Sequence, residues 1–210
     1  MDGEFTFSSA GQVHELELAM KRVGGWNAAL VTVLCGGNNA GLVRDFLLGD
    51  AEIVARDHFR ETRELTIQIP ALPRPTLEEL REQFPWIREK DGIERDTSPT
   101  HAVTLRLGTV LGLDDERVDG AEYERRLAPK LDSLLGYQQA VWLLKNQDAF
   151  PALMEQCGKI YIDFPGLVVV DADGDRYFPY LSRGGERWVL YWYWIDDGLS
   201  RDGRIAVSSK

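Results

Sequence analysis

The chain has 210 residues, of which 44% are hydrophobic and 28% are charged, a composition that is ordinary for a globular protein. Its formal net charge is −10, and residues 1–120 carry 21 of the 34 acidic side chains against 13 of the 24 basic ones. This acidic excess repels a phosphate backbone and disfavours nucleic acid as a partner. No stretch reaches the roughly 20 apolar residues of a spanning helix, and no signal-peptide pattern is present, so we expect a cytoplasmic protein without a membrane partner.

Residues 1–59 carry helical patterns. Ser9 and Gln12 have the spacing of a capping box, and apolar residues recur after them at helical intervals. The next run, Trp26–Cys35, is ambiguous, because its β-branched residues favour a strand whereas an Asn27 cap and two following glycines favour a short helix. We favour the helix, and we predict that residues 1–59 form a helical N-terminal portion.

Strand patterns begin after residue 59. Residues 65–69 and 103–107 each alternate apolar and polar side chains, as expected of strands that are buried on one face. Between them, Thr76 and Glu79 have the spacing of a second capping box, which begins a short helix that a proline ends. This unit fits either an antiparallel pair or a crossover connection. The exposed face of each strand favours an antiparallel sheet that helices cover.

Helices follow in the middle of the chain. Asp119 provides a cap for a helix whose apolar residues share one face, and Pro129 must kink or split that helix. Gly136 separates it from another helical run, and we expect a short helix within residues 148–156. Residues 60–158 are thus predicted to hold the strand–helix–strand unit and a helical middle.

The segment 159–210 has the clearest strand pattern and holds ten of the 21 aromatic residues. Asp171–Asp175 contains the Asp-Gly dipeptide that favours a type I′ hairpin turn, and Arg183–Glu186 predicts a second turn. These turns join the strands of a β-meander. The predicted fold class is therefore α+β, with a helical N-terminal portion, an antiparallel sheet with covering helices and an aromatic-rich C-terminal meander, either as separate portions or as one continuous domain.

One predicted strand, residues 187–195, is apolar on both faces, because successive side chains of a strand point to opposite sides. One face presents Trp188, Leu190, Trp192 and Trp194, and the other presents Val189, Tyr191, Tyr193 and Ile195. Such a strand either lies inside a core or shows an aromatic face to a partner. Aromatic residues in strands are mostly core, whereas Trp and Tyr are also enriched at binding hot spots, so both interpretations stay open.

We expect a non-enzymatic interaction or structural protein that binds another protein, or a second copy of itself, through this strand. The predicted binding residues are Tyr191, Trp192, Tyr193, Trp194, Arg187 and Asp196. A rival interpretation is a small-ligand-binding protein or hydrolase with a pocket beside the meander, because a carboxylate next to a tryptophan is typical of sugar-processing sites. A third is a protein that stacks single-stranded nucleic acid on the aromatic face.

The sequence predicts no catalytic, metal-binding or cofactor-binding set of residues. Asp171, Asp173 and Asp175 have the spacing of the first three ligands of a calcium loop. However, Arg176 stands where that loop needs a glycine, and Ser182 stands where it needs a bidentate glutamate. The three histidines do not fall at metal-ligand spacing, and no G-x-S-x-G motif accompanies them.

Several segments together resemble a known family. These are Glu64–Arg81, with its Glu64-Leu65-Thr66 strand and Thr76–Leu80 helix, then Trp26–Leu48, and finally Tyr161–Val207, in which the run Asp171–Leu181 is followed by the Trp-rich strand. They are similar to an uncharacterised family of small bacterial cytoplasmic proteins. No activity is assigned to that family, so the resemblance implies neither a function nor a site, but it supports the helical interpretation of Trp26–Cys35.

Overall fold

The computed structural model describes residues 58–88 and 90–209, so the helices predicted within residues 9–48 lie outside the described part. The strands are β1 (Arg60–Ile69), β2 (Gly92–Asp96), β3 (Val103–Thr109), β4 (Arg117–Val118), β5 (Tyr161–Asp163), β6 (Leu167–Val170), β7 (Arg176–Gly184), β8 (Arg187–Trp194), β9 (Leu199–Ser200) and β10 (Gly203–Ser209). The α-helices are α4 (Leu77–Gln83), α5 (Gly120–Leu127), α6 (Tyr137–Asn146) and α7 (Pro151–Gln156), and short 3-10 helices are η1 (Ala128–Ser133), η2 (Gln147–Ala149) and η3 (Ile195–Asp197).

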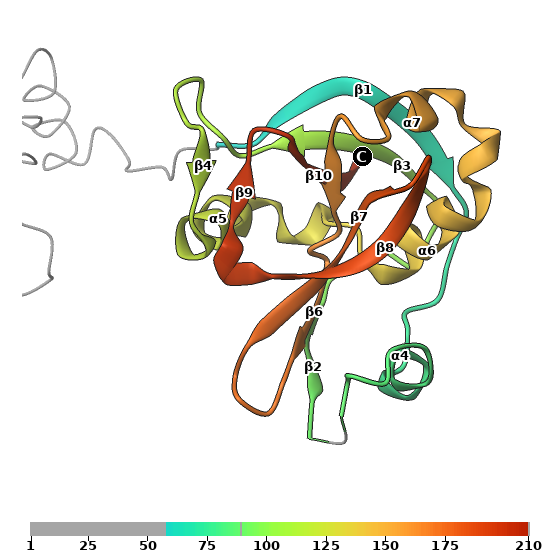
Figure 1. Ribbon diagram of the computed structural model, residues 1–210, viewed down its shortest axis with the longest axis vertical. Coiled ribbons are helices and arrows are strands. Elements are labelled where there is room, and N and C mark those ends of the chain that lie inside the picture. The colour runs from blue at the N-terminus through green and yellow to red at the C-terminus, as the bar shows by residue number, and fades with distance from the viewer. Residues whose placement is uncertain (1–57, 89, 210) are drawn as a thin grey trace, which may run out of the picture. The chain divides into compact units, whose positions relative to one another are not determined.

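These elements form an α+β fold, as the sequence predicts (Figure 1). One mainly antiparallel sheet has eight strands in the order β1-β3-β10-β5-β7-β6-β2, with β8 paired to β7, and β4 and β9 form a separate two-stranded ladder. β1 and β3 are antiparallel neighbours, from Arg60 opposite Thr109 to Ile69 opposite Val103, so the predicted strand pair is confirmed and the crossover alternative is wrong.

β10 joins the middle of the chain to its C-terminal part. It lies between β3, with which it is antiparallel, and β5, with which it is parallel. The sheet therefore takes strands from residues 60–158 and from residues 159–210, and these two portions form one continuous unit. Consecutive strands β6, β7 and β8 are antiparallel neighbours in the aromatic C-terminal part.

The helix boundaries follow the predicted caps. The Thr76 hydroxyl accepts from the Glu79 N–H at 3.2 Å, and the Glu79 carboxylate accepts from the Thr76 N–H at 2.7 Å, which is the reciprocal pattern of a capping box. The Asp119 carboxylate accepts from the Glu122 N–H at 2.9 Å and begins α5. Pro129 ends the α-helical hydrogen bonding, and the chain continues as η1.

The Asp171–Asp175 turn joins β6 and β7 as predicted, but type I′ is wrong. That geometry needs positive φ at both central residues, whereas only glycines have positive φ among the described residues, with Gly174 at 92°. The Asp171 carboxylate instead accepts from the N–H groups of Asp173 at 3.0 Å and of Asp175 at 2.9 Å. An aspartate side chain that caps its own loop stabilises a longer turn without a left-handed aspartate.

The core lies on both sides of the sheet. On one side, α6 and α7 pack against β1, β3 and β8, where Trp188, Leu105 and Leu143 belong to one buried cluster. On the other side, Tyr123 and Leu127 of α5 pack with residues of β7, β9 and β10. Both faces are covered in this way, and β1, β2 and β8 are the edge strands of the sheet among the described residues.

Candidate functional site at the edge of β8

β8 is an edge strand. It pairs only with β7, along eight residue pairs from Tyr177 opposite Trp194 to Gly184 opposite Arg187. The predicted extended conformation of residues 187–194 is confirmed, and Ile195 instead begins η3. An edge strand presents one row of backbone N–H and C=O groups away from the sheet, so the first question is which residues of β8 carry that row.

Two independent contacts identify the outward-facing residues. The Trp188 N–H donates to the side-chain oxygen of Gln147 at 3.0 Å, and the Gln147 amide donates to the Trp188 carbonyl at 3.4 Å, so the Trp188 backbone points away from β7. Opposite Trp192, the Pro179 carbonyl accepts from Phe164 N–H at 2.9 Å on the far side of β7. Pro179 and Trp192 therefore form a non-hydrogen-bonded pair, in which the backbone groups of both residues point away from each other.

The backbone groups of successive residues point to alternate sides of a strand. Leu190, midway between Trp188 and Trp192, therefore also has its N–H and C=O on the outer side. Gln147 satisfies the outward groups at Trp188, but within residues 58–88 and 90–209 no hydrogen bond reaches the outward groups of Leu190 and Trp192. We call the outward N–H and C=O groups of Leu190 and Trp192 the open edge of β8. Unpaired strand edges are templates for pairing with another extended chain.

The side chains of one face of β8 are partly core. Trp188 is 1% exposed, and its indole N–H donates to the Leu153 carbonyl at 2.9 Å. Trp192 packs edge-on against Phe84 and Trp86, each with ring centroids 5.4 Å away, and its indole nitrogen is buried with no partner among the described residues. The core interpretation therefore applies to Trp188 and to most of Trp192.

The opposite face of β8 is a half-buried cluster of tyrosines. Tyr193 packs against Tyr180 at 5.1 Å and Phe178 at 5.7 Å between ring centroids, and Tyr180 also lies 5.7 Å from Tyr191. Burial raises the pKa of Tyr180 and Tyr193 above the usual tyrosine value. Tyr191, at the outer end of this cluster, is 41% exposed.

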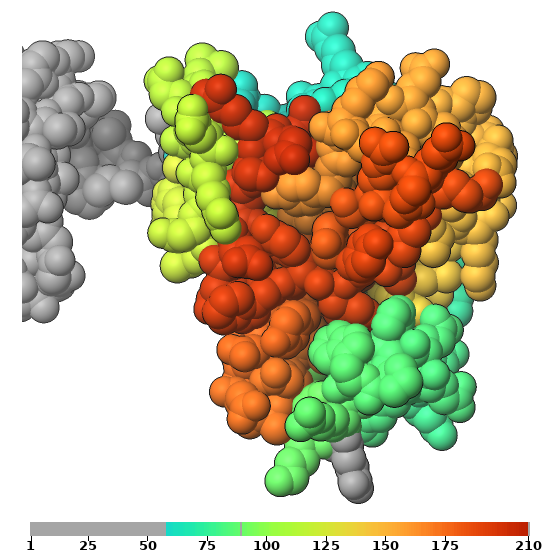
Figure 2. Space-filling model, viewed as in Figure 1, coloured from blue at the N-terminus to red at the C-terminus, as the bar shows by residue number. Residues whose placement is uncertain are grey.

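Exposed aromatic side chains gather at this strand. The described residues expose four large hydrophobic side chains, namely Trp86, Leu113, Tyr191 and Trp194. Trp194 is 40% exposed on β8, and Trp86, which contacts Trp192, is 38% exposed. In Figure 2 the orange-red segment that contains β8 faces the viewer and borders the green segment that contains Trp86. The core interpretation therefore holds for Trp188, whereas Tyr191 and Trp194 are at the surface and their contact with a partner stays a prediction.

The two charged residues of the predicted site lie at opposite ends of β8. Arg187 precedes the aromatic run and forms an exposed ion pair with Asp148 at 2.7 Å. Asp196 is exposed in η3, after the strand. The structure thus does not bring Arg187 and Asp196 together, and the cavity found in the described residues is lined by neither of them nor by Trp194.

A buried acid escaped the sequence analysis. Asp163 on β5 is fully buried and accepts a hydrogen bond from the Tyr123 hydroxyl at 3.0 Å, while its second carboxylate oxygen has no partner among the described residues. Burial raises the pKa of the Asp163 carboxyl well above its usual value, and the hydrogen bond from Tyr123 offsets this only in part. Nothing in the run Tyr161–Asp163 indicates the burial, because β5 is too short for a clear alternation.

Comparisons with protein-family models, with curated proteins and with solved structures find no match for this chain. The resemblance to an uncharacterised bacterial family therefore stays a prediction. In the part of the chain that the structure describes, no helix has the length and apolar character needed to cross a bilayer.

Proposed function

We propose that this is a non-enzymatic cytoplasmic interaction protein, which binds an extended segment of polypeptide along the open edge of β8. The observation that carries the proposal is the unpaired outward backbone of Leu190 and Trp192, beside the exposed rings of Tyr191 and Trp194. Main-chain hydrogen bonds supply affinity when a strand is added to a sheet edge, and flanking side chains supply specificity.

The composition of β8 supports this proposal. Proteins protect exposed sheet edges with lysine, proline, bulges or inward charges, since an unprotected edge promotes aggregation. After Arg187, the strand Trp188–Trp194 has no charged residue and no proline, and its pairing with β7 contains no bulge. Among residues 58–88 and 90–209, Gln147 alone hydrogen-bonds to the outer backbone groups of β8, and it does so at Trp188. An edge of this kind is suited to pairing.

We propose a second copy of this chain as the occupant. β8 has a basic residue, Arg187, before its aromatic run, and acidic residues, Asp196 and Asp197, after it. In an antiparallel pair centred on Trp192, the outward groups of the two copies face each other, and Arg187 lies at the same end of the pair as the Asp196 and Asp197 that follow the partner's strand. The charges at both ends of the paired strands are then complementary, and one contact forms twice by symmetry.

The test is the mass of the full chain in solution, measured by sedimentation over a range of concentrations. We expect a dimer that dissociates on dilution. Tyr191→Lys and Trp194→Lys place a charge beside the open edge at exposed positions, and each is expected to weaken association by about tenfold or more. The matched control is Leu113→Lys, which changes another exposed apolar side chain away from β8 and is expected to leave association unchanged.

Folding of each variant is checked by its thermal unfolding midpoint. A monomeric wild-type chain at every concentration contradicts self-pairing. The proposal is also wrong if Leu113→Lys weakens the dimer as much as the two β8 variants do.

A further inference from the structure

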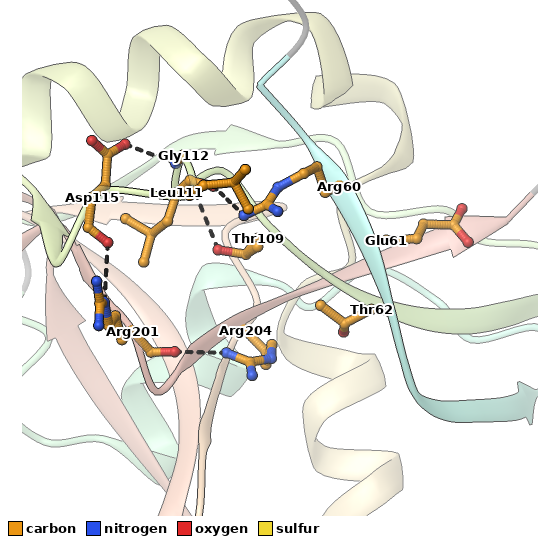
Figure 3. Close-up of a pocket in the computed structure, with 10 residues that line it drawn as sticks. Arg60, Glu61, Thr62, Thr109, Leu111, Gly112, Asp115, Arg201 and Arg204 are labelled. Atoms are coloured by element: carbon orange, nitrogen blue, oxygen red, sulfur yellow. Dashed lines mark hydrogen bonds between the residues drawn. The ribbon is translucent and has the colours of Figure 1, made fainter.

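A cavity of about 300 Å³ lies away from β8, between the start of β1, the turn after β3 and the β9–β10 turn (Figure 3). Its volume is at the lower end of the range for small-molecule sites. The lining residues are Arg60, Glu61, Thr62, Thr109, Leu111, Gly112, Leu113, Asp115, Arg201 and Arg204. Three of these are arginines, although the protein as a whole has a net charge of −10.

Two of the three arginines have no carboxylate partner among the described residues. Arg60 donates to the Leu111 carbonyl at 2.6 Å, and Arg201 donates through Nε to the Asp115 carbonyl at 3.3 Å. These backbone contacts hold the side chains without neutralising their charge. Arg204 differs, because it forms an ion pair with Glu64 at 2.8 Å.

The acidic residues of the lining do not compensate for Arg60 and Arg201. The carboxylate of Asp115 pairs with Arg126 and accepts from the Gly112 N–H at 2.8 Å, and the hydrogen bond from Arg126 lowers the pKa of Asp115. The side chain of Glu61 points away from the other labelled residues in Figure 3, and it lies 4.0 Å from the guanidinium of Arg106. Among the described residues, no carboxylate therefore neutralises the charges of Arg60 and Arg201 in the cavity.

A hydroxyl donor lies in the same cavity. The Thr109 oxygen accepts from the Leu111 N–H at 3.2 Å, so its own proton remains for another acceptor. Thr109 is nearly buried, at 9% exposure, and its hydroxyl lies between the Arg60 and Arg201 side chains in Figure 3. Guanidinium groups and a hydroxyl are the donors that recognise phosphate oxygens.

We propose that this cavity binds the phosphoryl group of a small phosphate monoester. A dianion neutralises both Arg60 and Arg201, whereas a carboxylate neutralises only one of them. Guanidinium forks match the tetrahedral oxygens of phosphate, and the backbone contacts of both arginines reduce the side-chain entropy that binding costs. No residue of β8 lines this cavity, so ligand binding here is independent of the proposed strand pairing.

Isothermal titration of the full chain with inorganic phosphate, glycerol 3-phosphate and acetate tests the proposal. We expect saturable binding of the two phosphates and at least about tenfold weaker binding of acetate. Phosphate affinity is expected to be higher at about pH 8 than at about pH 5, because the second pKa of a phosphate monoester is roughly 6.

Arg60→Gln and Arg201→Gln change exposed side chains, and each is expected to weaken phosphate binding by about tenfold. The matched control is Arg74→Gln, an exposed arginine outside the cavity that lies near Asp96, and it is expected to bind phosphate as the wild type does. Thermal unfolding confirms that each variant is folded. Absence of phosphate binding, equal binding of acetate, or an equal loss in Arg74→Gln overturns the proposal.

Discussion

Gln147 and Trp188 form a reciprocal pair in which one side-chain amide satisfies both backbone groups of an edge-strand residue. The Gln147 oxygen accepts from the Trp188 N–H at 3.0 Å, and its nitrogen donates to the Trp188 carbonyl at 3.4 Å and to the Leu144 carbonyl at 2.9 Å. Gln147 thereby occupies the place of a neighbouring strand at one residue of β8. The open edge begins immediately after this contact, at Leu190.

Gln147→Leu is expected to destabilise the protein by about 1–3 kcal/mol, because it leaves the buried N–H and C=O of Trp188 without partners. Urea unfolding followed by tryptophan fluorescence measures this loss. Gln156→Leu is the matched control, since Gln156 is half-buried and its side chain makes no hydrogen bond within the described residues. An equal loss of stability in the two variants contradicts the role assigned to Gln147.

Trp188→Phe and Trp192→Phe remove the same atoms from two positions on the same face of β8. The indole N–H of Trp188 donates to the Leu153 carbonyl, whereas that of Trp192 is buried without an acceptor among the described residues. Removing a satisfied donor leaves a carbonyl unpaired, while removing an unsatisfied one relieves a cost. We expect Trp188→Phe to lower the free energy of unfolding by at least about 1 kcal/mol more than Trp192→Phe does. Equal losses in urea unfolding contradict this assignment.

The buried carboxyl of Asp163 makes the free energy of unfolding depend on pH, and the direction of its pKa shift sets the direction of that dependence. Its folded-state pKa lies well above the unfolded value of roughly 3.9, so between these two values the folded protein binds more protons than the unfolded chain. The free energy of unfolding therefore falls as pH rises through this window, by up to about 1.4 kcal/mol for each pH unit. This contribution is fully present below the unfolded pKa and is lost above the folded one.

Asp163→Asn removes this titration and keeps an oxygen that accepts from Tyr123. Relative to wild type, the variant is expected to gain stability as the pH rises above the unfolded-state value of roughly 3.9. The control is Asp132→Asn, an exposed position, where the difference from wild type is expected to stay constant. A constant difference for Asp163→Asn as well shows that burial does not disfavour its charged form.

Much of the secondary structure was predictable because local signals determine it. The alternation in residues 65–69 and 103–107, the Thr76 capping box and the Asp119 cap all appear at the predicted positions. The parallel pairing of β10 with β5 was not predictable, because nothing in either short strand encodes its neighbour. The short helix predicted within residues 148–156 is α7, and it begins at Pro151, a residue that favours the first helical position.

The candidate site was predictable only in part. The apolar character of both faces of β8 indicated an unusual strand, and Tyr191 and Trp194 are indeed exposed. The division between core and surface depends on α4 and α6, which cover Trp192 but leave Trp194 at the surface. The arginine cavity was missed, because Arg60 and Arg201 are 141 positions apart and only the β1-β3-β10 order brings them together.

Hydrogen exchange at the Leu190 and Trp192 amides tests strand pairing along β8 most directly. NMR of the isotopically labelled full chain at low and high concentration measures it, with Trp188 as the internal reference, because Gln147 protects that amide at every concentration. The account predicts that the Leu190 and Trp192 amides exchange slowly in concentrated samples and rapidly on dilution. Rapid exchange at both amides in concentrated samples contradicts it, because their outward N–H groups then have no partner strand.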